Sequence, residues 1–255
     1  MVFTLNASCG SFLGTGRNNN EDNFYFNRKH LPASNKGLKN PLACNVTTEE
    51  PVAFAVFDGM GGECMGEQAS FITGKVFSEE YKRLGELALS GKEFMYNICE
   101  KANFAVNEMR KENRLSSAGT TLAAIYFLHN EVVACNVGDS RIFRIRDKKM
   151  LQISEDHTDE KIMNTIGIKK KPVLLQYIGI SDTELMLEPY ISKGDTQSGD
   201  IYILCSDGVT DVLDNNEIYE IANKNTADEA VRQILARVNE KDGADNSTVI
   251  VIKTV

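Results

Sequence analysis

Short apolar runs of strand length alternate along this chain with longer segments that have helical periodicity. The run PVAFAVFD, residues 51–58, is apolar up to its last residue, which indicates a strand buried on both faces. Apolar residues recur at helical spacing over residues 66–89 and 92–113, and this pattern predicts two amphipathic helices. Residues 226–241 predict another helix, with Thr226 as its N-cap.

Further strands are predicted on both sides of these helices. Residues 2–9 and 22–27 have strand-like patterns, and a polar loop is expected from there to about residue 50. Four short runs after the second helix indicate an antiparallel meander: TTLAAIYFL, VVACNVG, RIFRIR and MLQIS. The runs TELMLEPYI, DIYILCSD and STVIVIKTV predict the remaining strands. Strands and helices in blocks favour an α+β fold with antiparallel sheets, and without a visible linker we expect one domain over residues 1–255.

Composition excludes several functional classes. The chain has a net charge of −8 and no basic stripe, which argues against a nucleic-acid partner. No apolar stretch is long enough to span a bilayer, and the N-terminus does not resemble a signal peptide. The six cysteines are scattered and form no C-x-x-C pair, as expected for free thiols in a reducing compartment. We therefore expect a cytoplasmic protein with no membrane partner, and nothing in the sequence indicates an obligate oligomer, so a monomer is expected.

Acidic residues recur where apolar strands end or begin. The residues with this placement are Glu21, Asp22, Asp58, Asp139, Asp207 and Asp245. A single aspartate of this kind is usually a turn residue, but adjacent strands that each end in a carboxylate would gather like charges at one end of a sheet. Such a cluster costs free energy unless a cation neutralises it or the pKa values rise. Carboxylate oxygens suit Mg²⁺ and Mn²⁺, whereas no Cys/His cluster favours zinc, so the sequence predicts a site for hard divalent cations.

Two further features lie close to these carboxylates. Arg17 either binds a phosphate through its planar guanidinium or is an ordinary surface arginine. Glycines at positions 59, 61, 62 and 208 would leave backbone carbonyls and bound water accessible next to the acidic residues. Neither GTGR nor GMGG is followed by the Lys-Ser/Thr of a P-loop, so no nucleotide cradle is expected.

Seven motifs resemble, in their order along the chain, those of the metal-dependent protein phosphatases of the 2C type in their compact bacterial form. These motifs are GRNNNEDN, VFDGMGGECMGEQAS, SAGTTLAAI, NVGDSRIFRI, EDHT, LCSDGVTDVL and DNSTVIVI. The ordered set covers nearly the whole chain, although each motif alone is weak. The resemblance implies a four-layer αββα sandwich of two antiparallel sheets flanked by helices. It also implies a serine/threonine phosphoprotein phosphatase that opposes a bacterial kinase and uses two Mn²⁺ or Mg²⁺ ions.

The resemblance assigns the two-metal core to a small set of residues. Asp58 would bridge both metal ions, and the carbonyl of Gly59 would bind one of them. Asp207 and Asp245 would bind one ion, and Asp22 would reach the metals mainly through water. A hydroxide that bridges the two metals would then attack phosphorus in line.

The resemblance also implies roles around this core. Arg17 would bind the substrate phosphate, and Glu21 would act at the outer shell. Asp139 and Asp211, together with Asp207, match a third, weaker metal site of relatives.

The chain departs from the family pattern at several positions. Met60 stands where many relatives have a histidine proposed as the general acid, and Glu63 replaces the histidine of the bacterial DGMGGH motif. The acid that protonates the leaving group is therefore unidentified. The alternative function is a catalytically weak or dead phosphoprotein-binding regulator of the same fold, and a phosphatase acting on an anti-sigma-factor antagonist is a variant of the leading one. The flap segment, about residues 159–180, is short, and Gln176 replaces an arginine common in relatives.

The flap also has a basic run that is either a solvated loop or an attractor for acidic phosphoproteins. If it attracts substrates, replacement of Lys169, Lys170 and Lys171 by glutamine should raise KM for an acidic phosphopeptide, because the local positive charge is lost. Hydrolysis of a small aryl phosphate should not change. Steady-state kinetics with both substrates measure this, and equal effects on the two would contradict the hypothesis.

Overall fold

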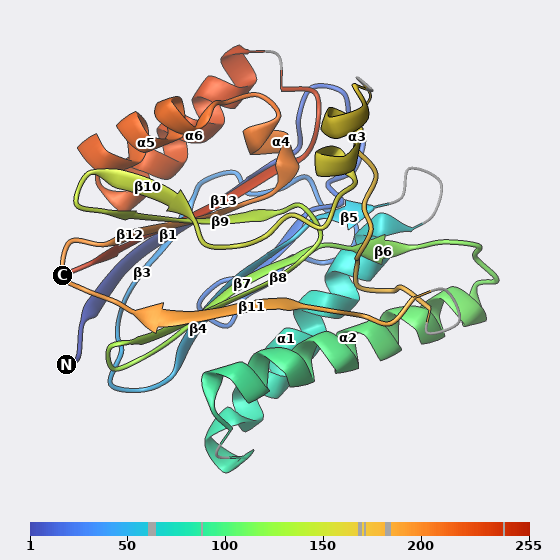
Figure 1. Ribbon diagram of the computed structural model, residues 1–255, viewed down its shortest axis with the longest axis horizontal. Coiled ribbons are helices and arrows are strands. Elements are labelled where there is room, and N and C mark those ends of the chain that lie inside the picture. The colour runs from blue at the N-terminus through green and yellow to red at the C-terminus, as the bar shows by residue number, and fades with distance from the viewer. Residues whose placement is uncertain (61–64, 88, 168–169, 171, 182–184, 242) are drawn as a thin grey trace.

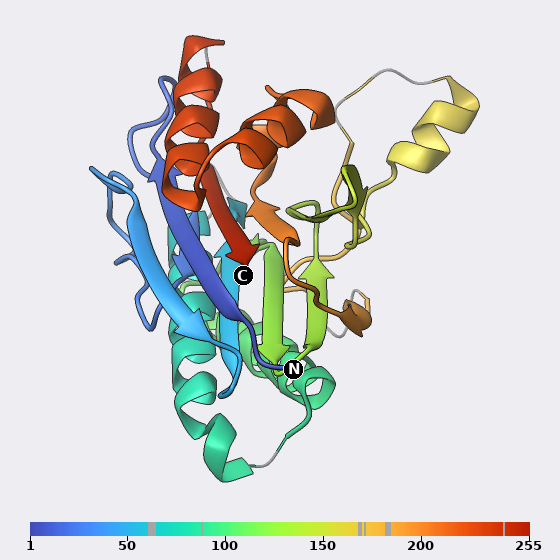
Figure 2. The same cartoon turned by 90° about the vertical axis from the view of Figure 1, so that its left-hand side faces the viewer.

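The computed structural model has two stacked antiparallel sheets with helices on both outer faces (Figures 1 and 2). The structure describes residues 1–60, 65–87, 89–167, 170, 172–181, 185–241 and 243–255. Five residues used in the sequence predictions lie outside these ranges, namely Gly61, Gly62, Glu63, Lys169 and Lys171.

One large sheet has six strands and the other has five. The six-stranded sheet contains, in spatial order, β10 (Lys149–Gln152), β9 (Arg141–Arg146), β12 (Ile201–Cys205), β13 (Ser247–Thr254), β1 (Thr4–Phe12) and β3 (Leu42–Thr47). The five-stranded sheet contains β11 (Tyr190–Asp195), β8 (Glu131–Val137), β7 (Leu122–Leu128), β4 (Val52–Phe57) and β2 (Asn23–Tyr25). A ribbon of two short strands, β5 (Gly59–Met60) and β6 (Gly119–Thr120), lies at one end of the molecule.

The helices form the two outer layers. The pair α1 (Gly66–Leu87) and α2 (Gly91–Glu112) covers the five-stranded sheet, and the pair α5 (Asn215–Lys224) and α6 (Ala227–Glu240) covers the six-stranded sheet (Figure 1). The short helices are α3 (Glu160–Ile166), in the flap segment, and α4 (Asp207–Thr210), which directly follows β12. This arrangement confirms the predicted α+β class and the αββα order of layers.

Three buried apolar clusters fill the three interfaces between the layers. Phe77, Phe94 and Tyr126 pack between α1, α2 and the five-stranded sheet. Phe127 and Tyr202 meet between the two sheets, with ring centroids 5.2 Å apart. Each sheet is therefore covered on both faces, which explains why β4 is an unbroken apolar run, as predicted. The third cluster joins the six-stranded sheet to α5 and α6.

The predicted meander is wrong in its connectivity. β7 pairs with β8, and β9 pairs with β10, but these two hairpins belong to different sheets. The chain crosses between the sheets at Gly138, whose φ of +101° is suited to glycine. A Cβ there would also lie 2.7 Å from Cγ2 of Thr121. Alternation within each strand reports burial but not which sheet a strand joins, so the sequence pattern missed this crossover.

Other differences concern shorter elements. The predicted loop before residue 50 contains β3, and the strand expected over 183–191 is β11, which begins only at Tyr190. Helices α3, α4 and α5 were not predicted, because they are short and bury few residues. The N-cap of α6 is confirmed, since the backbone N–H of Glu229 donates to Oγ1 of Thr226 at 3.3 Å.

The interface between α1, α2 and the five-stranded sheet should lose much of its stability when Phe77, the aromatic residue at its centre, is truncated. Phe77 is fully buried against Tyr25, Phe57 and Phe94, so Phe77→Ala should lower the free energy of unfolding by about 3–5 kcal/mol. Phe104 is 68% exposed on α2, and Phe104→Ala is the matched control, with an expected change below about 0.5 kcal/mol. Urea denaturation of both variants measures the difference, and similar losses would contradict this assignment of the core.

Candidate active site

The register of the strands brings the predicted acidic residues to one end of the sandwich. Asn23 pairs with Phe57, so the next residues outward, Asp22 and Asp58, lie beside one another at the edge of the five-stranded sheet. β4 and β8 are both antiparallel to β7, so their C-terminal ends point the same way and Asp139 arrives at the same edge.

The six-stranded sheet contributes from the other side. Cys205 pairs with Val249, which places Asp207, after β12, near Asp245, before β13. Phe12 pairs with Ser247, so the loop after β1 carries Arg17 to the same place. Residues that lie far apart in the sequence thus meet here, because β12 and β1 end at this place and β13, which lies between them, begins there.

A cavity of about 490 Å³ lies at this end of the molecule. The predicted site residues that line it are Arg17, Glu21, Asp58, Gly59, Asp139, Asp207 and Asp245. Asp22 is 1% exposed and lies beneath the cavity, next to Asp58 and Asp207. Asp211 is exposed at the C-terminus of α4 and is not among the lining residues. The structure therefore brings together every predicted site residue except Asp211.

The backbone around Asp58 is held by two threonines. The Thr120 hydroxyl and the Thr121 N–H both donate to the carbonyl of Asp58 at 2.8 Å. The N–H of Asp58 donates to Oγ1 of Thr121 at 3.0 Å, and this hydroxyl in turn contacts that of Ser140 at 2.6 Å. These bonds fix the position of Asp58 relative to the next strand of the sheet.

The glycines near the acidic residues serve close backbone packing. A Cβ on Gly59 would lie 2.4 Å from the carbonyl oxygen of Gly66 and 2.6 Å from that of Glu21. A Cβ on Gly208 would lie 2.0 Å from the carbonyl oxygen of Asn246. These two glycines let α1 and α4 approach neighbouring backbone, and the expectation that they also keep carbonyls accessible to bound water stays a prediction.

Burial and mutual repulsion raise the pKa of the two innermost carboxyls. The pKa of Asp22 rises to about 7, mainly because of burial, with repulsion from Asp207 and Asp245 acting against hydrogen bonds from Ser206 and Thr248. The pKa of Asp58 also lies well above its ordinary value, because of burial first and then repulsion from nearby aspartates. At neutral pH these groups need either a proton or a nearby cation.

Asp22 has one oxygen that the protein satisfies and one that it does not. Ser206 donates to Oδ2 of Asp22 at 2.7 Å. Oδ1 is buried and has no hydrogen-bond partner among the described residues. A buried, unpaired carboxylate oxygen is costly, and it is the kind of group that a cation or its bound water would satisfy.

The groups around the cavity suit a hard divalent cation. Within the described ranges, no three acidic, histidine or cysteine side chains converge in a compact ligand cluster. The carboxylates instead face one another around the cavity, with raised pKa values at Asp22 and Asp58 and one orphaned oxygen on Asp22. An all-oxygen set of this kind fits Mg²⁺ or Mn²⁺, whose charge would relieve the repulsion.

Arg17 is the basic residue among the described residues that line the cavity. Its Nη2 lies 2.8 Å from Oδ1 of Asp245, and both side chains are partly exposed. The guanidinium therefore lies at the cavity mouth beside the acidic cluster, where a phosphate group could reach it.

Asn246 was not predicted from the sequence and holds the loop that carries Arg17. Its Oδ1 accepts from the N–H of Glu21 at 2.8 Å, and its Nδ2 donates to the carbonyls of Leu13 and Asn19. The only sequence signal was its place in DGADNST, beside Asp245 and directly before a strand.

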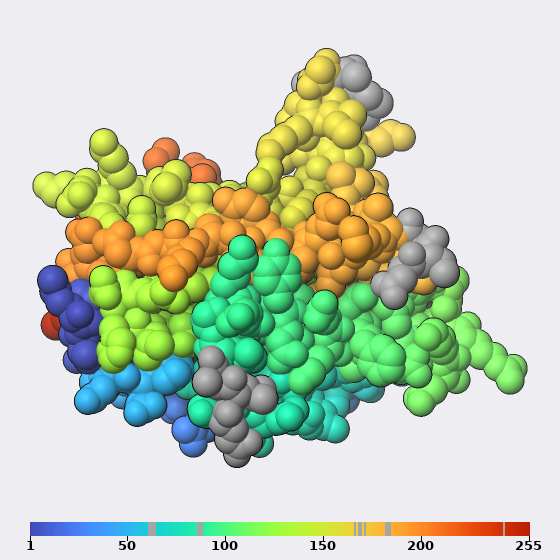
Figure 3. Space-filling model, turned by 60° about the horizontal axis from the view of Figure 1, so that its bottom comes forward, coloured from blue at the N-terminus to red at the C-terminus, as the bar shows by residue number. Residues whose placement is uncertain are grey.

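The flap contributes an apolar wall that the sequence did not identify. Pro172, Val173, Leu174 and Tyr177 line the cavity opposite the carboxylates, together with Met60. Figure 3 shows the flap segment, in yellow, standing out from the body of the molecule. Gln176 lies behind this wall and is buried, and its amide bonds to the backbone of Met186 and Glu188.

Comparison with known protein sequences gives consistent relatives. The sequence model of the family described as Protein phosphatase 2C matches residues 39–248. The serine/threonine phosphatase stp of Listeria innocua is 30% identical over 223 residues, which cover 80% of this chain and 85% of that protein. The serine/threonine protein phosphatase PstP of Mycobacterium tuberculosis is 28% identical over 263 residues, covering 100% of this chain but 46% of that protein.

Comparison with solved structures supports the fold. The catalytic domain of PstP, solved in complex with two manganese ions, has a TM-score of 0.76 at 26% identity, with 100% of both chains covered. PppA of Pseudomonas aeruginosa has a TM-score of 0.77 at 19% identity, which bears on the fold alone.

No helix in the described part of the chain is long and apolar enough to cross a membrane.

The repulsion at Asp22 predicts a pH-dependent stability in EDTA-treated protein. Its carboxyl has an ordinary pKa of 3.8 and a folded pKa of about 7, so unfolding releases a proton between these values. The free energy of unfolding should therefore fall as pH rises from about 4 to about 7. Asp22→Asn lacks this titration, and its stability relative to the wild type should rise over the same window, by at most about 1.4 kcal/mol per pH unit.

Urea titrations over this pH range measure the effect. Saturating Mn²⁺ should remove the advantage of the variant, because the cation neutralises the wild-type carboxylates. Parallel pH profiles for the two proteins in EDTA would contradict the assigned repulsion.

Proposed function

The chain belongs to the protein phosphatase 2C family, and we propose from this that it is a metal-dependent serine/threonine phosphoprotein phosphatase whose active site is the acidic cavity. The observation that carries the proposal is the convergence of Asp58, Asp207 and Asp245 around one cavity with Arg17 at its mouth. The relatives named as serine/threonine phosphatases favour an enzyme over a regulator that only binds phosphoproteins.

Two cation positions are proposed for this cavity. Asp58 would lie between the ions, with the Gly59 carbonyl, Asp22, Asp207 and Asp245 as the other protein groups that hold them. A pair of Mn²⁺ or Mg²⁺ ions supplies Lewis acidity toward the phosphate oxygens and lowers the pKa of the attacking water. The manganese complex of PstP supports the metal type and the number.

Residues around the core would tune this site. Glu21 and Asp139 line the cavity and would bind metal-coordinated water. A third ion is not proposed, because Asp211, which it would require, is exposed and lies off the cavity.

Other residues of the cavity would bind the substrate phosphate or hold the site rigid. Arg17 would bind the substrate phosphate through its planar guanidinium, and its partner Asp245 orients it. Thr120 and Thr121 hold the Asp58 backbone still, so the carboxylate needs little reorganisation during the reaction. Met60 lines the cavity but has no titratable proton, so it does not protonate the leaving alkoxide.

The proposal extends to the substrate class, an opposing kinase, the oligomeric state and the cellular location. Phosphoproteins are the substrate class of the named relatives, and we propose an opposing serine/threonine kinase and a monomeric enzyme on the family resemblance alone. A cytoplasmic location is supported by the thiols of Cys9, Cys44, Cys99, Cys135 and Cys205, which are all free.

Hydrolysis of a phosphothreonine peptide by metal-stripped protein tests the proposal. Activity should appear on addition of Mn²⁺ and should fall by at least about 100-fold in Asp207→Asn, because one carboxylate ligand and its charge are lost. Phosphate release measured against Mn²⁺ concentration gives both values.

Asp228→Asn, on the exposed start of α6, is the control and should retain full activity. Folded protein that binds Mn²⁺ but releases no phosphate would contradict the enzyme and would favour the phosphoprotein-binding regulator.

A further inference from the structure

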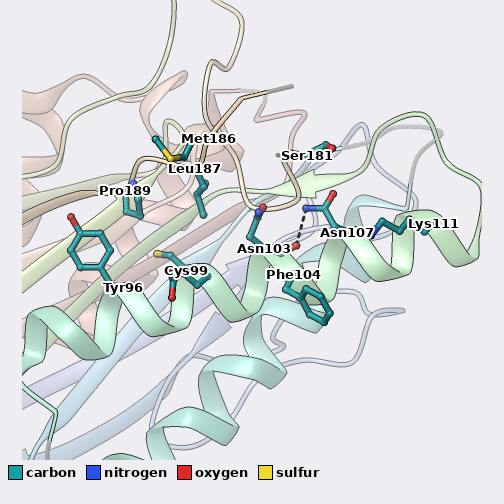
Figure 4. Close-up of a pocket in the computed structure, with 11 residues that line it drawn as sticks. Tyr96, Cys99, Asn103, Phe104, Asn107, Lys111, Ser181, Met186, Leu187 and Pro189 are labelled. Atoms are coloured by element: carbon teal, nitrogen blue, oxygen red, sulfur yellow. Dashed lines mark hydrogen bonds between the residues drawn. The ribbon is translucent and has the colours of Figure 1, made fainter. Parts of the chain in front are cut away.

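A second cavity, outside the proposed active site, lies along α2. Its volume is about 580 Å³, within the range of cavities that accept a small ligand or the side chains of a peptide. One wall is α2, and the other is the segment that leads into β11. Figure 4 shows side chains of both walls facing the cavity. We call this cavity the α2 groove and define it by Tyr96, Glu100, Asn103, Met186, Leu187 and Pro189.

The walls of the α2 groove are apolar and accessible. Met186 is 69% exposed, and Tyr96 is also exposed, although both are large apolar side chains. Leu187 and Pro189 continue the apolar wall on the side facing α2 (Figure 4). A hollow lined by exposed apolar side chains and rimmed by polar ones is typical of a surface that buries a partner side chain.

The charge in the groove is negative. Glu100 is exposed and makes no ion pair among the described residues. Lys111 also lines the groove, but Glu108 lies 2.8 Å away and neutralises it. Lys92 lies over the Tyr96 ring toward the N-terminus of α2. Among the described residues that line the groove, Glu100 is thus the charged side chain without an ion-pair partner, and it favours a basic group on whatever occupies the groove.

One stretch of chain forms a wall of both cavities. Pro172, Val173, Leu174 and Tyr177 line the active-site cavity, and Ser181, Met186, Leu187 and Pro189, further along the same chain, line the α2 groove. Gln176 joins the two parts, because its Nε2 donates to the Met186 carbonyl at 3.2 Å and its Oε1 accepts from the Glu188 N–H at 3.1 Å.

Hydrogen bonds also fix the floor of the groove relative to the active site. Nδ2 of Asn103, on α2, donates to the carbonyl of Ile180 at 3.1 Å. Two residues earlier, Ile178 exchanges backbone hydrogen bonds with Thr120. The hydroxyl of Thr120 donates to the Asp58 carbonyl at 2.8 Å. A ligand that reaches both cavities therefore meets two sites held at a constant separation.

We propose that the α2 groove docks the phosphoprotein substrates through a short segment in which a large apolar side chain lies next to a lysine or arginine. The apolar side chain packs between Met186 and Tyr96, and the basic group pairs with Glu100. This rests on the proposed phosphatase function. Docking at a second, fixed site raises the effective concentration of the phosphorylated residue at the active site, so it lowers KM and leaves kcat unchanged.

Synthetic phosphothreonine peptides test the proposal. Each peptide carries either a Leu-Arg pair or a Ser-Gln pair. The pair lies N-terminal or C-terminal to the phosphothreonine and is separated from it by a Gly-Ser spacer, whose length varies across the series. KM should fall by about tenfold for Leu-Arg peptides of one spacer length and one direction, because burial of a leucine side chain stabilises the complex. Ser-Gln peptides should show no optimum.

Matched variants test whether the change in KM arises in the α2 groove. Met186→Ser should raise KM for the best Leu-Arg peptide by about fivefold, and Leu185→Ser, a neighbouring residue that is 49% exposed but does not line the groove, should not. Glu100→Gln should raise KM by about two- to threefold, whereas Glu112→Gln, exposed at the end of the same helix, should have no effect. Hydrolysis of p-nitrophenyl phosphate should be the same in all four variants.

Direct binding separates the two proposals. A fluorescein-labelled Leu-Arg peptide without phosphothreonine should bind the wild type, and Met186→Ser should weaken this binding. Normal hydrolysis of all peptides with no spacer optimum and no binding would overturn the docking site and leave the phosphatase intact. Loss of peptide binding in Met186→Ser without any hydrolysis by the wild type would instead refute the phosphatase while supporting the groove.

Discussion

The mutual repulsion of the carboxylates gathered at one end of the sandwich is the constraint on which the rest of this structure depends. Asp22 is buried beside Asp58, which is partly exposed to the cavity, and Asp207, Asp139 and Asp245 lie close enough to raise the pKa of one or both. Repulsion of this kind lowers stability unless a cation is bound, and the surrounding fold has to keep the charges together. The three apolar interfaces between the four layers supply that stability.

Local contacts fix the positions of the carboxylates within this stable fold. Thr120 and Thr121 hold the backbone of Asp58, and Ser206 holds one oxygen of Asp22. Gly59 and Gly208 allow neighbouring backbone to approach so closely that no other residue fits. The carboxylates therefore cannot relieve their repulsion by moving apart, and a fixed set of carboxylate oxygens of this kind suits a small, highly charged cation.

The flap connects this site to the surface of α2. Pro172, Val173, Leu174 and Tyr177 line the acidic cavity, and Met186, Leu187 and Pro189, further along the same chain, line the α2 groove. Gln176 uses both ends of its amide to join the two stretches. An amide can donate and accept in this way, whereas a guanidinium only donates. A glutamine at this position thus favours a rigid wall shared by the two cavities.

The sequence by itself determined the composition of this protein's layers and most of its acidic site. Apolar runs and helical periodicity predicted β4, α1, α2 and α6, because burial on both faces or on one stripe leaves a direct signal in residue type. The ordered motifs predicted the carboxylates that meet at the cavity, since each lies where a strand begins or ends. Short elements such as β3 and α5 gave too little periodicity to be recognised.

Only the tertiary structure decided which of these pieces meet. The crossover at Gly138 assigns two adjacent hairpins to different sheets, and no alternation pattern reports a choice between sheets. Strand register brings Asp22 beside Asp58, whereas Asp211, at the C-terminus of α4, is not among the residues that line the cavity, although all three lie in family motifs. The roles of Asn246 and Gln176, and the α2 groove itself, depend on contacts between residues distant in sequence. Such contacts are fixed by packing and register, which the order of residues along a chain does not display.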